Sequence, residues 1–104
     1  MAKSKSRKKP PADPRSAAAY LNAALADGNR AAVMLALHRL AEAYGGVSKL
    51  AQHSGLDRVA LYRTLSRRGN PSFKTLVALL EAMGMRLAVE PVGRQRWPAG
   101  DPPL

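Results

Sequence analysis

Cysteine is absent from the 104 residues of the sequence. This absence excludes disulfide bonds, thiolate metal ligands and thiol nucleophiles. Long apolar runs are absent too, since none approaches the roughly 20 residues that a membrane-spanning helix needs. No apolar segment follows the basic first residues, as it would in a signal peptide. We therefore expect a soluble protein of the cytoplasm with no membrane partner.

Acidic and aromatic residues are both scarce. Seven Asp and Glu residues stand against 17 Lys and Arg residues, which gives a formal net charge of +10 and a pI near 11.0. Such a charge favours a polyanionic partner. Aromatic residues make up only 5% of the chain, whereas hydrophobic residues, mostly Ala and Leu, make up 46%. This composition predicts closely packed helices, and a chain of this length supports one domain.

Residues suited to catalysis are not grouped anywhere in the sequence. There is no Gly-rich phosphate-binding loop, because the glycines fall at the ends of expected elements. His38 and His53 have no carboxylate cluster beside them, so we expect neither to bind a metal or to transfer protons. The serines near expected helix ends are explained as caps and turn residues. We expect no enzyme, no cofactor and no metal.

The apolar residues that are present repeat mainly at helical spacing. The helices expected from this spacing cover residues 16–26, 29–44, 47–66 (two short helices joined by a tight turn) and 72–83. Their expected N-caps are Ser16, Asn29 and Ser72. Glycines follow the first, second and fourth of these segments, where they are suited to ending a helix, and another lies at the turn within the third. Tyr44 and Phe73 are expected in the core, whereas Tyr20 fits either the core or a partner-binding surface.

Beyond the helices, residues 86–90 alternate polar and apolar side chains and are expected to form a short strand. A lone strand has no partner within this chain, so it would need a second protomer or another protein to satisfy its backbone. The expected fold class is all-α, a compact helix-turn-helix domain of about five helices with a short C-terminal strand.

The expected organisation has three parts. Residues 1–14 are expected to be a disordered basic tail, residues 15–91 the domain, and residues 92–104 a disordered Pro-rich tail. The basic tail fits two functions, a solubilising extension or an arm that lies along DNA. The sequence leaves both open.

The segment 47–66 has the pattern of a helix-turn-helix. Gly55 lies at the turn, where a positive φ is needed, and the small Ala51 lies where the two helices cross. The expected buried side of the two helices consists of Leu50, Leu56, Leu61 and Leu65. A second helix that presents Arg and Tyr outward from such a motif is suited to enter a DNA major groove.

Two sets of residues are the predicted DNA contacts. The predicted base-reading residues are Arg58, Val59, Tyr62 and Arg63, because Arg can bind guanine through two hydrogen bonds and Val can meet a thymine methyl group. The predicted phosphate contacts are Lys49, Arg67, Arg68 and Lys74. The alternative is an ordinary solvated helix face. Asp57 is the single acid between residues 47 and 74, which argues for DNA contact.

Two strings of the sequence resemble a known family. Residues 61–66 (Leu-Tyr-Arg-Thr-Leu-Ser), followed by residues 70–76 (Asn-Pro-Ser-Phe-Lys-Thr-Leu), resemble the Xre (Cro/repressor-type) helix-turn-helix domain. More narrowly, they resemble the HigA-like addiction-module antidote proteins. The early helix at residues 20–25 and the segment 84–89 are similar to the way those short proteins begin and end. The resemblance covers about residues 20–91.

The resemblance implies a bacterial type II antitoxin. Such a protein binds a RelE/HigB-type toxin, which is an mRNA-cleaving ribonuclease, and represses its own promoter as a homodimer bound to operator DNA. Two recognition helices in successive major grooves predict an inverted-repeat operator, and the protein would be nucleoid-associated when it is bound to DNA. The residues at the family's DNA-reading positions are Arg58, Val59, Tyr62 and Arg63, with Lys49 and Lys74 beside them. No local motif marks toxin-binding residues.

Three other interpretations stay open at this point. The first is a stand-alone prophage-type regulator without a toxin partner. The second is a protein-binding module that has lost its DNA affinity, although the arginines of the second helix argue against it. The third is a nonspecific nucleoid protein that binds any duplex through its Lys-rich tail.

Overall fold

The computed structural model describes residues 13–66, 68–91 and 93. About five helices were expected, and the described residues contain five. They are α1 (Pro14–Asp27), α2 (Arg30–Tyr44), α3 (Val47–Ser54), α4 (Arg58–Thr64) and α5 (Phe73–Ala82). The expected tails 1–14 and 92–104 lie outside the described residues, except for residues 13, 14 and 93.

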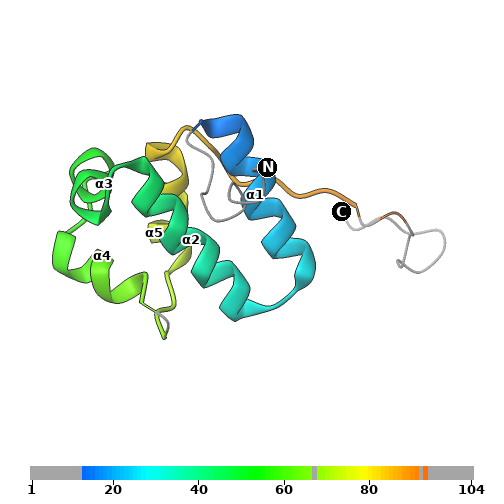
Figure 1. Cartoon of the computed structure of the whole chain (residues 1–104), viewed down its shortest axis with the longest axis horizontal. Helices are drawn as coiled ribbons and strands as arrows, with labels where there is room; N and C mark the ends of the chain where they lie inside the picture. The colour runs from blue at the N-terminus through cyan, green and yellow to red at the C-terminus, as the bar shows by residue number, and fades with distance from the viewer. Residues whose placement is uncertain (1–12, 67, 92, 94–104) are drawn as a thin grey trace, which may run out of the picture.

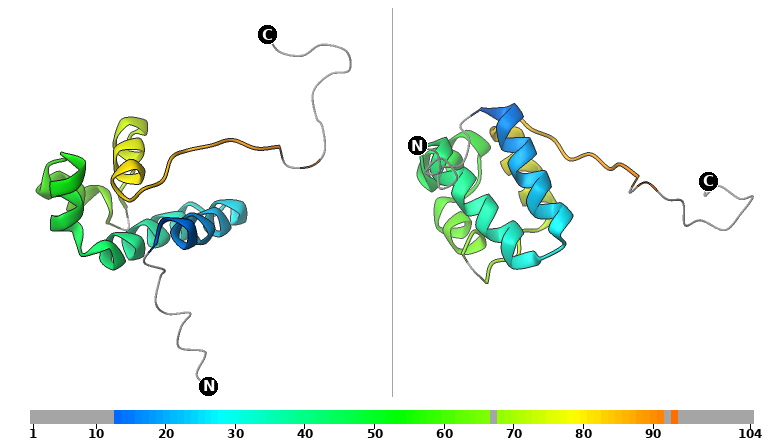
Figure 2. Two further views of the ribbon diagram at one scale, coloured as in Figure 1. Left: turned by 90° about the horizontal axis from the view of Figure 1, so that it is seen from above. Right: turned by 45° about the vertical axis from the view of Figure 1, so that its right-hand side comes forward.

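The helices form two groups that share one core. α1 and α2 form a hairpin and lie side by side (Figures 1 and 2), whereas α3 contacts α2, α4 and α5. The buried side chains are mostly Ala and Leu, as the composition predicts. The largest that are fully enclosed are Leu37, Leu40, Leu50, Leu61 and Leu79.

The first helix begins earlier than the sequence pattern suggests. Asp13, not Ser16, is its N-cap: the Ser16 backbone N–H donates to Asp13 Oδ1 at 2.8 Å. This hydrogen bond lowers the pKa of the Asp13 carboxyl below its ordinary value. Pro14 is the first helical residue, a position where a missing N–H costs nothing. The prediction of Ser16 as the cap was wrong because it assigned Pro14 to the tail.

The predicted caps of α2 and α5 are confirmed. Asn29 Oδ1 accepts the N–H groups of Ala31 and Ala32 at 2.8 and 3.3 Å. Ser72 Oγ accepts the N–H of Thr75 at 3.1 Å. At the other end of α5, the N–H of Gly84 (φ 84°) donates to the Glu81 carbonyl, and the N–H of Met85 donates to that of Leu80. This pair of bonds is the Schellman arrangement, which ends the helix after Ala82, with Met83 as its C-cap.

Phe73 lies on the surface, which corrects its prediction as a core residue. Its side chain is 74% exposed. Phe73 is the first residue of α5, and the fully buried positions of that helix, Leu79 and Leu80, lie in its second half. Helical spacing predicted the face of α5 but could not show that the start of the helix extends beyond the core. Tyr44 and Tyr20 are partly buried and pack against the core.

The predicted strand over 86–90 is not formed, which corrects the fold class in that detail. The residues from Met85 to Pro91 have no regular secondary structure, and no strand occurs in the described parts of the chain. A strand requires a second strand edge to receive its backbone hydrogen bonds. The described residues otherwise consist of helices and their connections, so this part of the chain offers no such edge.

Candidate nucleic-acid interface

The second helix of the α3–α4 pair is fixed at both ends and along one side. Asp57 Oδ2 accepts the N–H of Ala60 at 2.8 Å and caps the start of α4. Leu61 is buried in the middle of the helix, and Leu65 is buried directly after it. A seven-residue helix has little stability by itself. The cap and the two leucines therefore hold α4 on the core in one orientation.

The opposite side of α4 faces solvent. It carries the four predicted base-reading residues Arg58, Val59, Tyr62 and Arg63, all of them exposed; we call this set the α4 outer face. The apolar members are strongly exposed, Val59 by 58% and Tyr62 by 55%. Arg58 and Tyr62 lie one turn apart, as do Val59 and Arg63, so the four side chains share one broad surface.

The turn that presents this face depends on Gly55. Its φ is 77°, in the left-handed region, and its N–H donates to the Ala51 carbonyl to end α3. Ala51 and Leu50 are buried, and Leu56 in the turn packs against the core. The small residue, the glycine and the leucines predicted from the sequence therefore lie where the packing of α3 on α4 requires them.

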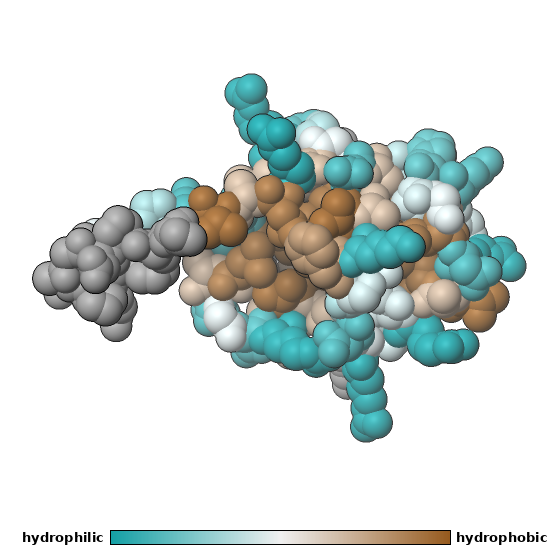
Figure 3. Space-filling view, turned by 180° about the vertical axis from the view of Figure 1, so that it is seen from behind, coloured by the Kyte–Doolittle hydropathy of each residue, from teal (hydrophilic) through white to brown (hydrophobic). Residues whose placement is uncertain are grey.

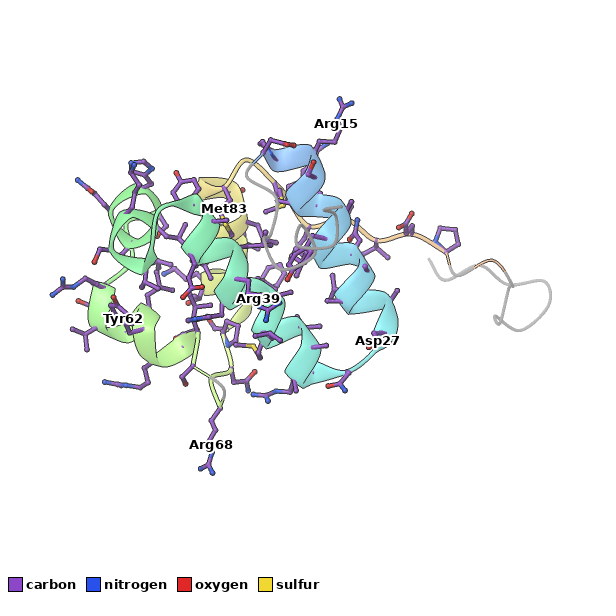
Figure 4. All side chains as sticks on the ribbon, viewed as in Figure 1. Arg15, Asp27, Arg39, Tyr62, Arg68 and Met83 are labelled. Carbon is purple, nitrogen blue, oxygen red and sulfur yellow. The ribbon has the colours of Figure 1, made fainter. Side chains whose placement is uncertain are left out.

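The predicted phosphate contacts lie around α4. Lys49 is exposed on α3, Lys74 is exposed in the first turn of α5, and Arg68 follows α4. Figure 4 shows Arg68 extending away from the body of the molecule. These three come from elements on both sides of α4 in the sequence. The fourth, Arg67, lies outside the described residues.

The described side chains near the cations of this region do not neutralise them. Within the described residues, Lys49, Arg58, Arg63, Arg68 and Lys74 form no ion pair. The ion pair found there joins His38 Nε2 to Glu42 Oε2 at 3.1 Å on α2. Because their charges are uncompensated, these cations remain available to an anionic partner.

Sequence reasoning missed the contact that joins the end of α4 to α2. Arg30 Nη2 donates to the Gly69 carbonyl, across 39 residues of sequence. Gly69 is buried, and a Cβ at this position would lie only 1.7 Å from the carbonyl oxygen of Thr64. The glycine thus permits the loop after α4 to pass directly against the end of the helix. The signal in the sequence was the glycine itself, which sequence analysis placed, like the other glycines, at the end of an expected element.

The two histidines are held by neighbouring side chains. The Tyr44 hydroxyl and His53 Nδ1 share a hydrogen bond, and the two rings meet edge to face with centroids 5.5 Å apart. His38 pairs with Glu42, one turn further along α2, which is a carboxylate that sequence analysis overlooked. Nowhere in residues 13–66, 68–91 and 93 do three His, Cys, Asp or Glu side chains approach closely enough to hold a metal ion.

The described structure is that of a small all-helical protein with an uncompensated basic surface around its fourth helix. None of its described helices has the length and apolar composition required to cross a bilayer. Residues 12–91 match the family described as "Probable addiction module antidote protein", and because the match covers most of the chain, the protein belongs to that family. Membership implies a toxin as the partner.

A curated relative also matches the chain. The chain is 34% identical over 71 residues to an uncharacterized protein of Haemophilus influenzae. The matched region covers 68% of this chain and 72% of the relative. No solved structure matches the chain. The Xre-type and HigA-like assignments are finer than these matches and stay predictions.

Proposed function

We propose that this antidote protein is a type II antitoxin that binds its own operator DNA through α4, as a dimer, and represses its promoter. We propose further that it neutralises a RelE/HigB-type mRNA-cleaving toxin in the bacterial cytoplasm. The observation that carries the DNA proposal is the α4 outer face. It combines two exposed arginines with two exposed apolar side chains on a helix whose other side is fixed to the core.

The chemistry of this face fits base reading in a major groove. Arg58 and Arg63 can each donate two hydrogen bonds to the O6 and N7 atoms of guanine, and Val59 can contact a thymine methyl group. An ordinary solvated face does not need a 58% exposed Val59 beside a 55% exposed Tyr62. Burying both against DNA bases would give these side chains a function, and the α3–α4 pair would then act as a helix-turn-helix.

The surrounding cations fit phosphate contacts. Lys49, Arg68 and Lys74 lie outside the α4 outer face and can position α4 without reading sequence. Arg67 is proposed with them on the sequence alone. Each neutralised phosphate releases counterions, so the affinity for DNA should fall steeply as salt rises.

We propose a dimer because it suits the geometry of duplex DNA. One α4 covers only a few base pairs, whereas two copies related by a twofold axis place two helices in successive major grooves, roughly 34 Å apart. The operator should therefore be an inverted repeat. The toxin partner follows from the family, and we propose that the bound antitoxin blocks the RNA site of the toxin. In both activities the protein acts by binding and not by catalysis.

The DNA proposal is tested by fluorescence anisotropy with the full chain at physiological salt. One duplex carries the sequence upstream of its own gene, and a second carries the same bases in scrambled order. We expect a preference of about a thousandfold or more for the upstream duplex. Equal, weak binding to both would overturn the repressor proposal and leave a toxin-binding module or a nonspecific DNA binder.

The toxin proposal is tested by co-expression. Candidate toxins are small basic proteins encoded beside this gene. Expression of such a neighbour alone should arrest growth and cleave cellular mRNA, and co-expression of this chain should restore both growth and intact mRNA. A variant in which Leu61 is replaced by Asp, which removes a buried anchor of α4, serves as the unfolded control. Failure of the native chain to rescue any toxic neighbour would favour a stand-alone regulator.

A further inference from the structure

The segment that follows α5 has no backbone hydrogen bond to the described residues beyond its first position, Met85. Its last backbone hydrogen bond runs from Met85 N–H to the Leu80 carbonyl, and within the described residues the backbone of 86–91 makes none. Figures 1 and 2 show this segment leaving the helices and extending to one side of them. A second chain can therefore reach its backbone N–H and C=O groups from the side.

The same segment exposes apolar side chains in alternation with polar ones. Val89 is 98% exposed and Leu87 39% exposed, whereas Arg86 and Glu90 flank them and are exposed as well. In extended backbone, residues 87 and 89 share one face and residues 86, 88 and 90 share the other. The segment thus has an unburied apolar face and a charged face with a small residue, Ala88, at its centre.

The charges at the two ends of the segment, Arg86 and Glu90, are opposite, so two antiparallel copies of it would attract each other. If two copies pair antiparallel about Ala88, Arg86 of each copy lies opposite Glu90 of the other, and Leu87 lies opposite Val89. A parallel pairing would instead place like charges opposite each other. We propose that residues 86–90 pair with the same residues of a second copy to form a two-stranded antiparallel ribbon, and that this ribbon is the dimer interface.

An isolated two-stranded ribbon is marginally stable, so its apolar face must pack against further surface. Figure 3 shows hydrophobic residues gathered in the middle of the face that carries α5 and the segment after it. Leu87 is the less exposed of the two apolar residues, whereas Val89 is covered by almost nothing in the described chain. The ribbon places four apolar side chains, two from each copy, next to that surface. The interface specifies the dimer invoked in the proposed function and in that respect rests on it.

The test is a charge exchange measured by sedimentation equilibrium with the full chain. Arg86→Glu and Glu90→Arg each replace both attractive cross-strand pairs by repulsive ones, so each should weaken the homodimer roughly tenfold. An equimolar mixture of the two variants should dimerise as tightly as the native chain, because one copy then carries only acidic and the other only basic groups at these two positions. The double exchange within one chain should also restore the native dimer.

Both positions are exposed, so the variants should fold normally, which circular dichroism and thermal unfolding can confirm. Native-like dimerisation of the single variants, a mixture that stays weak, or a native chain that is monomeric at 100-fold the concentration used for DNA binding would each overturn the proposal. Glu81→Arg, an exposed charge reversal on α5, is the matched control and should leave the dimer unchanged.

The outcome is separable from the DNA proposal. A dimer that assembles through the ribbon but shows no operator preference would sustain this inference and overturn the repressor. A dimer whose stability is unchanged in all the charge-exchange variants, but which prefers its operator, would overturn this inference and sustain the repressor. The anisotropy titration and the sedimentation measurement can be made on the same samples.

Discussion

The α1–α2 hairpin and the three helices that follow it share an interior of alanines and leucines, but their surfaces carry different charge. From residue 13 to 46 the charges balance, with Arg15, Arg30 and Arg39 against Asp13, Asp27 and Glu42. From residue 47 to 84 they do not, with Lys49, Arg58, Arg63, Arg67, Arg68 and Lys74 against Asp57 and Glu81. A helical core of this type does not need a basic surface, since the hairpin has none. The excess in the second region therefore indicates a partner and not a requirement of folding.

The exposed apolar residues of the two regions also have different neighbours. The hairpin exposes Leu25 and Leu35, each by about half. In the second region, Val59 and Tyr62 lie among arginines. An apolar side chain surrounded by cations suits a partner with both flat apolar groups and phosphates, and DNA has both.

The largest effect is expected from a substitution at the contact that joins the two regions. Gly69→Ala places a Cβ 1.7 Å from the Thr64 carbonyl oxygen, against backbone that cannot rotate away, and disturbs the carbonyl that accepts from Arg30. We expect the free energy of unfolding to fall by about 3 kcal/mol or more, measured by urea denaturation. Asn70→Ala, at the exposed neighbouring position, is the control and should change it little. A loss below about 1 kcal/mol for Gly69→Ala would show that the loop is free to move.

Removal of one arginine from each region tests whether the basic surface of the second region determines the preference for operator DNA. Arg63→Ala should lower the preference for operator over scrambled DNA by about 1–3 kcal/mol, because it would remove the proposed base contact. Arg15→Ala makes the same charge change on the exposed surface of α1 and should leave the preference unchanged (Figure 4). Both are measured by anisotropy. Equal losses on operator and scrambled DNA would make Arg63 a phosphate contact.

A smaller effect is expected within the hairpin. Asn29→Ala removes the side chain that accepts two N–H groups at the start of α2, which should cost about 1 kcal/mol of unfolding free energy. Asn22→Ala on the exposed side of α1 is the matched control and should be neutral or slightly stabilising, since alanine is the better helix former. Operator preference should not change in either variant. A change would mean that the hairpin takes part in DNA reading.

The smallest expected effect concerns pH and the start of α1. The hydrogen bond from Ser16 lowers the pKa of Asp13 in the folded chain, so its contribution to stability is present at neutral pH, above the unfolded pKa. That contribution is lost as pH falls through the lowered folded pKa, below about 4. The difference in melting temperature between the native chain and Asp13→Ala should therefore shrink between pH 6 and pH 3. A difference that is constant over this range would assign the effect to packing.

The sequence predicts the local features of this fold better than the distant ones. Asn29, Ser72, Gly55 and the exposed α4 residues were predicted correctly because caps, turns and helix faces depend on residues within one or two turns. Phe73 was predicted wrongly because its exposure depends on where α5 leaves the core. The Arg30–Gly69 contact was missed because it joins residues that are 39 positions apart. The strand over 86–90 was predicted wrongly for a similar reason. Alternating polar and apolar residues indicate a preference for strand pairing, but the described chain supplies no second strand.

The division of α4 into a buried side and an exposed side also bears on how such proteins diverge. Leu61 and Leu65 carry the attachment to the core, while Arg58, Val59, Tyr62 and Arg63 contribute little to it. Substitutions on the exposed side can therefore accumulate at little cost to folding. If α4 reads DNA as proposed, a duplicated gene could acquire a new operator through a few such changes and keep its fold, so that related copies in one genome would each bind a different operator.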